Sequence, residues 1–224
     1  MNSYLELWKS ENKYKRTIII IGAGSLGKMT ASILVDNEIY EKSSIAFVDD
    51  QIETGSIILG FPLLGKLSEI LIDVEFSQNA DFVIAIANNK TRKKIDEKYP
   101  NLNYVNVIHN SAVISKYAKI GTGNIILPNV SVDPEAIIMN HVVLNKNSTI
   151  GHNVTMCNYT QACPGTNLGG YIDECAFLGL GSIVLPNIRI GRNSIIGAGS
   201  VVNKEIPDNY VAMGTPCIPV KAIE

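Results

Sequence analysis

An aliphatic side chain recurs every six residues through the second half of the chain. The period runs from Ile114 to Leu168, slips at Gly169-Gly170-Tyr171, and resumes from Ile172 to Val202. Most of these aliphatic residues are followed, four positions later, by a small or β-branched residue. A period of six puts one inward-pointing aliphatic side chain on each short flat segment, and three segments close a triangular coil that stacks on the next at about 4.8 Å. The repeat therefore predicts a parallel β-helix of roughly five coils.

The chain before this repeat has the alternating pattern of a parallel α/β sheet. A β-branched strand leads into the turn Gly22-Ala-Gly-Ser-Leu-Gly27, and a helical segment follows. Strand, helix and strand in alternation build a sheet with helices on its faces. We expect strands over 17–21, 44–48, 81–87 and 104–108, and helices over 28–40 and 91–99.

The fold predicted for the whole chain is a Rossmann-like α/β domain followed by the β-helix. The segments are an N-terminal extension over 1–16, the α/β domain over 17–110, the β-helix over 111–207 and a C-terminal tail over 208–224. Only about ninety residues and four strands precede the β-helix, which suits one mononucleotide-binding half rather than two.

The charge balance and the cysteines exclude several classes of function. Lys and Arg number 19 against 21 Asp and Glu, so a net charge of -2 provides no global positive field for a nucleic acid. The longest apolar run is far too short to cross a bilayer, and residues 1–16 lack the apolar core of a secretory signal. The four cysteines contain no CxxC pair. We therefore expect a reduced, cytoplasmic protein without membrane insertion.

Several motifs make the chain recognisable when they are taken with the repeat. They are Ile18-Ile-Ile-Ile-Gly-Ala-Gly-Ser-Leu-Gly-Lys28, Phe47-Val-Asp-Asp50, Gly60-Phe-Pro-Leu-Leu-Gly65, Val83-Ile-Ala-Ile-Ala-Asn-Asn89 with Arg92, Ile150-Gly-His-Asn153, Cys163-Pro-Gly165, Leu168-Gly-Gly170, Ile206-Pro-Asp-Asn209 and Gly214-Thr-Pro216. With them the chain resembles the family of left-handed β-helix acetyltransferases that contains the sialic acid O-acetyltransferases and the N-acetyltransferases of nucleotide-linked amino sugars. The resemblance covers nearly the whole chain after Lys15, and the segment from Gly60 to Gly65 is what narrows the family.

The resemblance implies a left-handed β-helix, acetyl-coenzyme A as co-substrate, no metal, and a homotrimer with active sites between adjacent β-helices. It implies that His152 is the general base and that the N–H of Gly170 faces the thioester carbonyl, where it can hold the oxyanion. His152 follows the glycine of a hexad, a position from which a side chain points outward from the prism.

The resemblance also implies where coenzyme A lies, because Val211-Ala-Met-Gly-Thr-Pro216 is similar to the family segment along the pantetheine arm. The family commonly has Asp or Glu after the histidine, whereas Asn153 can orient the imidazole but supplies no charge. A second family histidine is replaced here by Gln161. The coenzyme contacts implied are Asn153, Gln161, Gly170, Gly179, Gly197, Gly214 and Pro216.

The turn from Gly22 to Gly27 fits G-x-G-x-x-G between a strand and a helix, with two aspartates at the end of the next strand. Backbone amides and the helix N-terminus would meet a diphosphate there. The resemblance assigns that diphosphate to a nucleotide-sugar substrate, and a turn kept only for packing is the alternative. The predicted substrate contacts are Gly22, Gly24, Ser25, Leu26, Asp49, Asp50 and Asn89.

Neither a metal site nor a covalent intermediate is favoured. A zinc site in such a prism needs three converging imidazoles, but His109 precedes the repeat and His141 stands only eleven residues before His152. Cys157 and Cys163 occupy the slot where the repeat prefers small residues, which favours packing over nucleophilic catalysis. Direct attack by the acceptor is therefore expected.

The predicted function is acetyl transfer from acetyl-coenzyme A to a UDP-, dTDP- or GDP-linked 4-amino sugar. O-acetylation of a free sialic acid-like sugar is the nearest alternative, and its α/β domain would have no nucleotide to bind. Asn153 and Gln161 leave open a sensor or scaffold that has lost catalysis. The glycine turn leaves open a dinucleotide-dependent oxidoreductase, which binding of NAD(P) would test.

Overall fold

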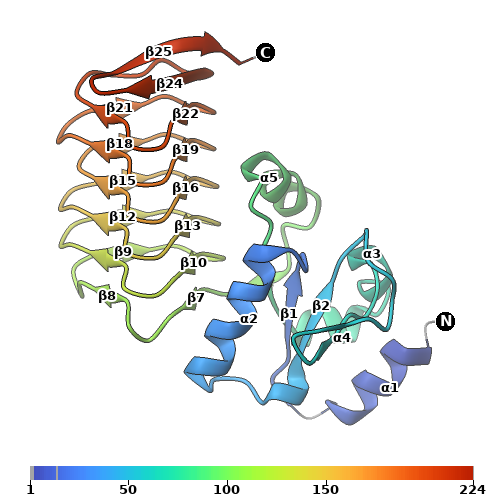
Figure 1. Cartoon of the computed structure of the whole chain (residues 1–224). Coiled ribbons are helices and arrows are strands. Elements are labelled where there is room, and N and C mark those ends of the chain that lie inside the picture. The colour runs from blue at the N-terminus through green and yellow to red at the C-terminus, as the bar shows by residue number, and fades with distance from the viewer. Residues whose placement is uncertain (1–2, 14, 224) are drawn as a thin grey trace.

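The computed structural model, which describes residues 3–13 and 15–223, begins with an α/β domain on a four-stranded parallel sheet (Figure 1). The sheet has the order β2-β1-β5-β6, with β1 (Ile18–Ile21), β2 (Ile45–Val48), β5 (Asp81–Ile84) and β6 (Asn103–Tyr104). The four isoleucines of β1 are all buried, as expected for a central parallel strand that is covered on both faces.

Helices cover both faces of this sheet. One face packs on α2 (Ser25–Asn37), and the other packs on the remaining helices and on Trp8 near the N-terminus. The remaining elements are α1 (Ser3–Glu11), the 3-10 helix η1 (Lys42–Ser44), the hairpin β3 (Ile57–Ile58) and β4 (Phe61–Pro62), α3 (Leu67–Ile70), α4 (Val74–Asn79) and α5 (Asn89–Lys98).

The helix after the glycine turn begins three residues earlier than the range 28–40 that the sequence predicts. Gly24 is the N-cap of α2, so Gly27 already lies in the first helical turn. A Cβ at Gly27 would overlap the carbonyl oxygen of Gly22, and only glycine lets the helix pack this closely against the turn. The turn before the helix therefore ends at Gly24, although the glycine motif continues to Gly27.

The β-helix has three flat faces, each formed by short parallel strands from successive coils. The first face contains β7 (Val107–Ile108), β10 (Ile125–Ile126), β13 (Val143–Leu144), β16 (Gln161–Ala162), β19 (Phe177–Leu178), β22 (Ile195–Ile196) and β24 (Tyr210–Gly214), with β25 (Cys217–Ala222) antiparallel to β24. The second face contains β8 (Val113–Ile114), β11 (Ser131–Val132), β14 (Thr149–Ile150), β17 (Asn167–Leu168), β20 (Ile183–Val184) and β23 (Val201–Val202). The third face contains β9 (Lys119–Ile120), β12 (Ile137–Ile138), β15 (Thr155–Met156), β18 (Tyr171–Ile172) and β21 (Arg189–Ile190).

The β-helix has about seven coils rather than the five that the repeat predicts, because it begins earlier and ends later. The single strand expected over 104–108 is two strands: β6 completes the α/β sheet, and β7 starts the first face of the β-helix. The domain division expected at 110/111 therefore falls after the first β-helix strand. At the far end, β24 and β25 complete the last coil from the predicted tail.

The predicted slip of phase is a coil that is two residues short. Thr155 pairs with Tyr171, sixteen residues later, whereas Ile137 pairs with Thr155, eighteen residues later. The residues are lost at the corner that contains Gly170, where a Cβ would overlap the carbonyl oxygen of Ile188. The tight corner thus needs glycine for its backbone alone.

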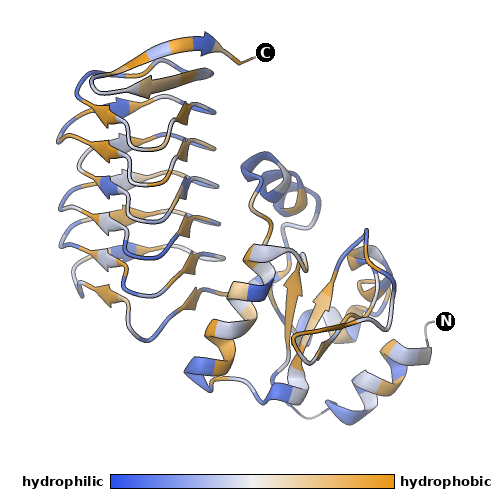
Figure 2. Ribbon diagram, viewed as in Figure 1, coloured by the Kyte–Doolittle hydropathy of each residue, from blue (hydrophilic) through white to orange (hydrophobic). Residues whose placement is uncertain are grey.

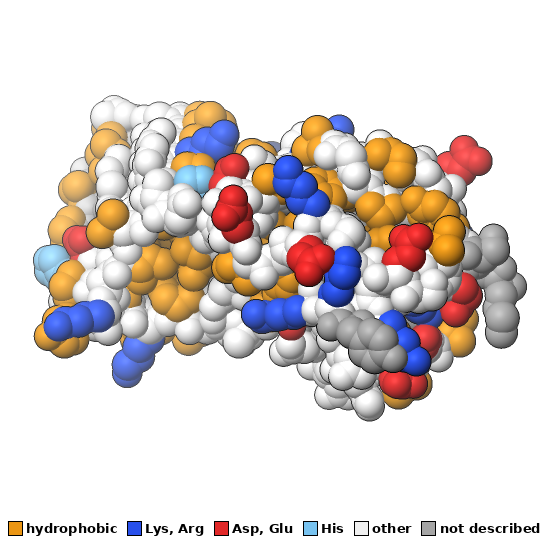
Figure 3. All heavy atoms as spheres, turned by 90° about the horizontal axis from the view of Figure 1, so that it is seen from below, with side chains coloured by type: hydrophobic (Ala, Val, Ile, Leu, Met, Phe, Trp, Pro, Cys, Tyr) orange, Lys and Arg blue, Asp and Glu red, His pale blue; other side chains and the backbone are white. Residues whose placement is uncertain are grey.

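The interior of the β-helix is a continuous apolar column of the inward aliphatic residues that the period identified. Hydrophobic residues recur on the strands of successive coils (Figure 2). Figure 3 shows charged side chains of both signs scattered over one face of the molecule, without a patch of one sign. Across the residues described, no helix is long and apolar enough to cross a membrane.

Candidate active site

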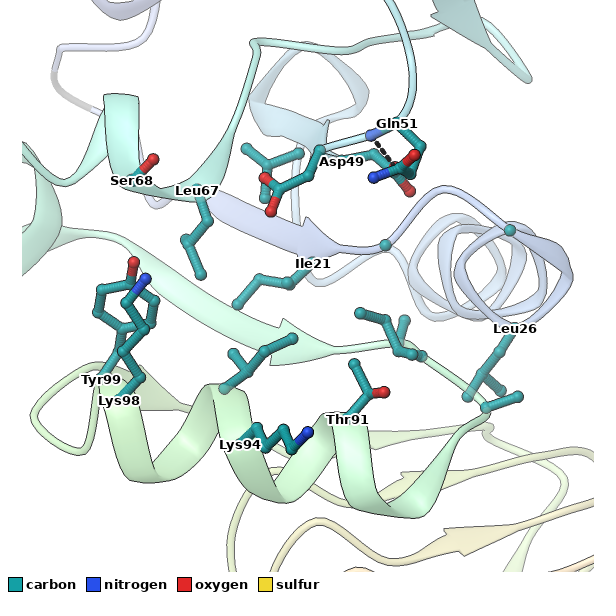
Figure 4. A pocket seen from close by; sticks show the side chains of 18 of the residues that line it. Ile21, Leu26, Asp49, Gln51, Leu67, Ser68, Thr91, Lys94, Lys98 and Tyr99 are labelled. Carbon is teal, nitrogen blue, oxygen red and sulfur yellow. Dashed lines mark hydrogen bonds between the residues drawn. The ribbon is translucent and has the colours of Figure 1, made fainter.

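A pocket of about 640 Å³ opens beyond the carboxyl ends of β1 and β5 (Figure 4). The chain passes from β1 to β2 on one side, and β5 lies on the other side of β1. This is the topological switch point at which open parallel sheets bind ligands. Loops after β1, β2 and β5 form the walls together with α5 and two residues of α3, Leu67 and Ser68. The volume is in the range of small-molecule sites.

The glycine turn forms one end of this pocket, where Gly22, Gly24, Ser25 and Leu26 are all lining residues. Gly22 has φ of 101°, and a Cβ there would lie 2.6 Å from the side chain of Ile86. A Cβ at Gly24 would meet no atom within 4 Å, and no side chain caps the N-terminus of α2. The first N–H groups of α2 are thus available to an anion in the pocket.

The two aspartates after β2 have different roles, although both line the pocket. Asp49 accepts hydrogen bonds from the N–H groups of Ala23 and Gln51, each at 2.9 Å, so its carboxylate holds the glycine turn to the loop after β2. Asp50 forms no hydrogen bond with any residue that the structure describes. Asp50 is therefore the carboxylate that is left to accept from a ligand hydroxyl.

Helix α5 supplies a wall that the sequence did not reveal. Thr91, Lys94, Ile95 and Lys98 line the pocket. Figure 4 shows the side chains of Thr91, Lys94 and Lys98 along the helix on one side of it. The sequence predicts only a solvated helix here. The spacing of i, i+3, i+4 and i+7 from Thr91 is the signal that could have found this face.

Asn89, a predicted substrate contact, lies elsewhere. Its side chain is buried, and its amide nitrogen donates to the carbonyl oxygens of Cys175 and Ala176, each at 3.0 Å. Its amide oxygen accepts from Arg92 at 2.9 Å. Asn89 joins α5 to the β-helix, and the prediction that it contacts substrate is not supported by its position.

His152 is an exposed side chain at the corner between the second and third faces. Its Nδ1 lies 2.9 Å from the amide nitrogen of Asn153, so the Asn153 side chain contacts the ring. Asn153 has φ of 60°, a left-handed conformation that asparagine adopts readily. The corner thus presents an imidazole on the surface with one ring nitrogen held and the other open.

Gly170 occupies the same corner one coil further along. The register pairs Ile150 with Leu168, which brings Gly170 over His152 at the spacing of adjacent coils, about 4.8 Å between backbones. The N–H of Gly170 donates to no acceptor among the described residues. An unused backbone donor therefore stacks beside the imidazole.

The other predicted coenzyme contacts lie in three places. Gly179 and Gly197 occupy the corner between the first and second faces in successive coils, and the N–H of Gly214 donates to Ser200 beside them. Pro216 follows in the turn between β24 and β25. Gln161 is buried under α5, with its amide oxygen 3.5 Å from Arg92 Nη1. Its position faces the α/β domain rather than either corner.

Other nucleophiles and metal ligands do not gather at His152. Over 3–13 and 15–223, no three His, Cys, Asp or Glu side chains come together as metal ligands. Burial raises the pKa of the thiols of Cys157 and Cys163, and a thiol that stays protonated is a poor nucleophile. This chemistry is consistent with direct attack by the acceptor.

The buried His141 leads to a prediction for stability. Its ring stacks on Tyr159, meets Tyr104 edge-on, and has Nε2 at 3.2 Å from Asp96. Burial lowers the pKa of His141, Asp96 opposes that shift, and the charge of Arg92 reinforces it. The unfolded state therefore binds more protons below about pH 6.5, so the stability from this group is present above that pH and is lost as pH falls.

We expect the melting temperature to fall as pH drops from about 7 to 5, and to fall less steeply in His141→Asn. Asparagine tolerates the positive φ of 56° at this position, so the variant changes the ring and not the backbone. Thermal unfolding across this pH range measures the slope. An equal slope in both proteins would show that His141 does not contribute.

The nucleotide-type pocket and His152 are separate features of one subunit. Helix α5 meets the β-helix at the corner between the third and first faces, through Tyr159 and Cys175 among others. His152 stands at the corner between the second and third faces, and the pocket lining includes no residue of that corner.

Known proteins share both parts of this architecture. Residues 17–99 match the PglD N-terminal domain family. Over 187 residues the chain is 29% identical to the GDP-perosamine N-acetyltransferase of Escherichia coli O157:H7, a match that covers 80% of this chain and 82% of that protein. Over 94 residues it is 46% identical to the galactoside O-acetyltransferase of Lactococcus lactis subsp. lactis (strain IL1403), covering 41% of this chain and 45% of that protein.

Solved structures repeat the whole arrangement. The acetyltransferase domain of PglB from Neisseria gonorrhoeae FA1090 is similar with a TM-score of 0.85 at 27% identity, covering 92% of this chain and 100% of that one. PerB from Caulobacter crescentus, solved in complex with CoA and GDP-perosamine, has a TM-score of 0.83 at 27% identity, covering 92% of this chain and 97% of that one.

Fold and site together define a hexapeptide-repeat acyltransferase with an α/β domain at its N-terminus. More narrowly, the chain is similar over most of its length to hexapeptide-repeat acetyltransferases, the kind of protein that the sequence motifs indicated.

Proposed function

We propose that the protein is an acetyl-CoA-dependent N-acetyltransferase that acts on the amine of a nucleotide-linked amino sugar. The observation that carries this proposal is the pocket at the switch point, joined in one chain to a hexapeptide β-helix. The N-terminus of α2 offers unpaired N–H groups to a diphosphate, and Asp50 offers an acceptor to ribose. Lys94 and Lys98 add positive charge for phosphate or for base carbonyl oxygens. PerB, with the same fold, binds CoA and GDP-perosamine, which supports the same pair of ligands.

His152 acts as the general base in this proposal. A base needs a lone pair on the ring nitrogen that faces the substrate, which requires the tautomer with the proton on Nδ1. In the structure the amide nitrogen of Asn153 faces Nδ1, so this tautomer requires the Asn153 amide to turn until its oxygen accepts from Nδ1–H. The amine then attacks the thioester carbonyl, a C–N bond forms and the C–S bond breaks. His152 takes the amine proton and returns it to the departing thiolate of coenzyme A.

Gly170 stabilises the charge that forms in this attack. The tetrahedral intermediate carries a negative oxygen, and a fixed backbone donor in a water-poor site lowers the energy of that oxygen. The unused N–H of Gly170 beside His152 supports this role.

A homotrimer completes the site in this proposal. Gly179, Gly197, Gly214 and Pro216 follow one corner of the β-helix, whereas His152 lies on another. We call Gly179, Gly197 and Gly214 the glycine line. Packing β-helices side by side can bring the glycine line of one subunit to the His152 corner of its neighbour, with coenzyme A between them.

O-acetylation of a sugar without a nucleotide is the second candidate. The 46% identity to a galactoside O-acetyltransferase over 94 residues favours it. Its acceptor would need neither the glycine turn nor Asp50, so nucleotide binding separates the two functions.

We expect calorimetry to detect binding of at least one of UDP, dTDP and GDP, and Asp50→Ala to weaken it about tenfold or more. A hydrogen bond to a charged group contributes about 1.5–3 kcal/mol, which corresponds to that loss. Glu53→Ala is the matched control, because Glu53 is exposed nearby and does not line the pocket. Binding of none of the three nucleotides by the wild type would favour O-acetylation.

A further inference from the structure

Helix α5 makes contacts on two opposite faces. One face lines the nucleotide pocket, through Thr91, Lys94, Ile95 and Lys98. The other contacts the β-helix, through Asn89, Arg92, Lys93 and Asp96. Both sets have the spacing i, i+3, i+4 and i+7, so a single short helix connects the pocket wall to the β-helix.

Arg92 is the centre of the second face and is fully buried. Its guanidinium donates to the backbone carbonyl oxygens of His141 at 3.1 Å and of Tyr159 at 2.8 Å, which belong to two successive coils. Burial lowers the pKa of Arg92 to about 10, so the group still carries its charge at neutral pH. A buried charge that is met only by carbonyl and amide oxygens depends on every one of them.

The same guanidinium also holds the floor of the pocket. Nη1 of Arg92 donates to the carbonyl oxygens of Ile86 at 2.8 Å and of Ala87 at 3.1 Å, and both residues line the pocket after β5. One planar side chain therefore connects two walls of the pocket, α5 and the loop after β5, to the β-helix. Lysine could not reproduce this fork of donors.

Asp96 makes the second connection, one turn further along α5. Its carboxylate accepts from the hydroxyl of Tyr159 at 2.5 Å and lies 3.2 Å from Nε2 of His141. Tyr159 and His141 also bear the carbonyl groups that Arg92 binds. The two connections thus share the same two residues of the β-helix.

We infer that Arg92 and Asp96 are positioning residues, which fix the nucleotide pocket relative to the β-helix so that the bound sugar reaches the acetyl group. This inference rests on the proposed function. The corner that receives α5 is not the corner of His152 or of the glycine line. Loosening α5 therefore displaces the nucleotide sugar and leaves the coenzyme site in place.

Steady-state kinetics with the two substrates varied separately test the inference. Arg92→Lys and Asp96→Asn are expected to lower kcat/KM for the nucleotide sugar by about tenfold to a hundredfold, because small displacements of a reacting group have effects of this size. The KM for acetyl-CoA is expected to stay within about twofold. Tyr159→Phe, which removes only the hydroxyl that Asp96 binds, is expected to show the same pattern to a smaller degree.

Lys93→Ala is the matched control. Lys93 lies on the same face of α5 and pairs with Glu174 at 2.8 Å, but the pair is partly exposed and such pairs contribute little. Its kinetics are expected to match the wild type. If Arg92→Lys does not fold, Asp96→Asn and Tyr159→Phe decide the question.

Two outcomes overturn the inference. One is that kcat/KM for both substrates falls together with the melting temperature, which indicates general destabilisation. The other is that neither substrate is affected in an active enzyme. A wild type that acetylates no nucleotide sugar contradicts instead the proposed function, so the two failures are distinguishable.

Discussion

Replacing His152 with alanine is expected to lower kcat by about 100- to 10,000-fold, with the KM of both substrates changed about twofold or less. General base catalysis by a positioned side chain contributes a factor of this size. His152 is exposed and stacks beside the unused N–H of Gly170, so its side chain supports neither the core nor the coil. Thiol release from acetyl-CoA measures the rate, and the melting temperature is expected to be unchanged.

His152→Gln separates proton transfer from surface shape. Glutamine can keep a hydrogen bond to Asn153 and is polar, but it cannot take up a proton at neutral pH. We expect the same loss of kcat as in His152→Ala. A glutamine variant with near-normal kcat would mean that His152 only shapes the site, and another base would have to be sought.

Replacing Gly24 with aspartate is expected to weaken nucleotide binding about a hundredfold or more without lowering the melting temperature. Gly24 has φ of -72° and ψ of -164°, ordinary values for an N-cap, and a Cβ there meets no atom within 4 Å. Aspartate is a favoured N-cap residue, so the helix tolerates it. Its carboxylate, however, would stand at the end of the pocket where a diphosphate is proposed to bind, and like charges at close range repel strongly.

Gly24→Asn is the matched control, since asparagine has nearly the same size and caps a helix equally well. The difference in nucleotide affinity between the two variants, measured by calorimetry, isolates the effect of charge. Equal affinities would indicate that no phosphate lies at the N-terminus of α2.

Repetition made most of the fold predictable from sequence. Each coil repeats the same inward aliphatic position, so the six-residue period predicts the register of the faces. The slip in that period predicts the short coil at Gly170. The glycine turn could also be predicted, because local backbone conformation requires its glycines. Gly22 has a positive φ, and Gly27 lies against the carbonyl oxygen of Gly22. Local conformation and periodicity can therefore be predicted from the sequence.

Contacts between the two domains could not be predicted in this way. Val107 reads as the continuation of the strand before it, but it pairs with Ile125 of the β-helix instead of with the α/β sheet. Asn89 follows strand β5 and reads as a pocket residue, yet its amide is used by carbonyl groups of a distant coil. These placements depend on how α5 docks, which no local pattern encodes.

The most direct test of the proposed function is the product formed from acetyl-CoA and a panel of UDP-, dTDP- and GDP-linked amino sugars. Mass spectrometry after treatment with hydroxylamine distinguishes an amide, which survives, from an ester, which is cleaved. We predict one acetyl group attached as an amide to a nucleotide-linked amino sugar. Acetylation only of sugars without a nucleotide, through an ester bond, would contradict the account.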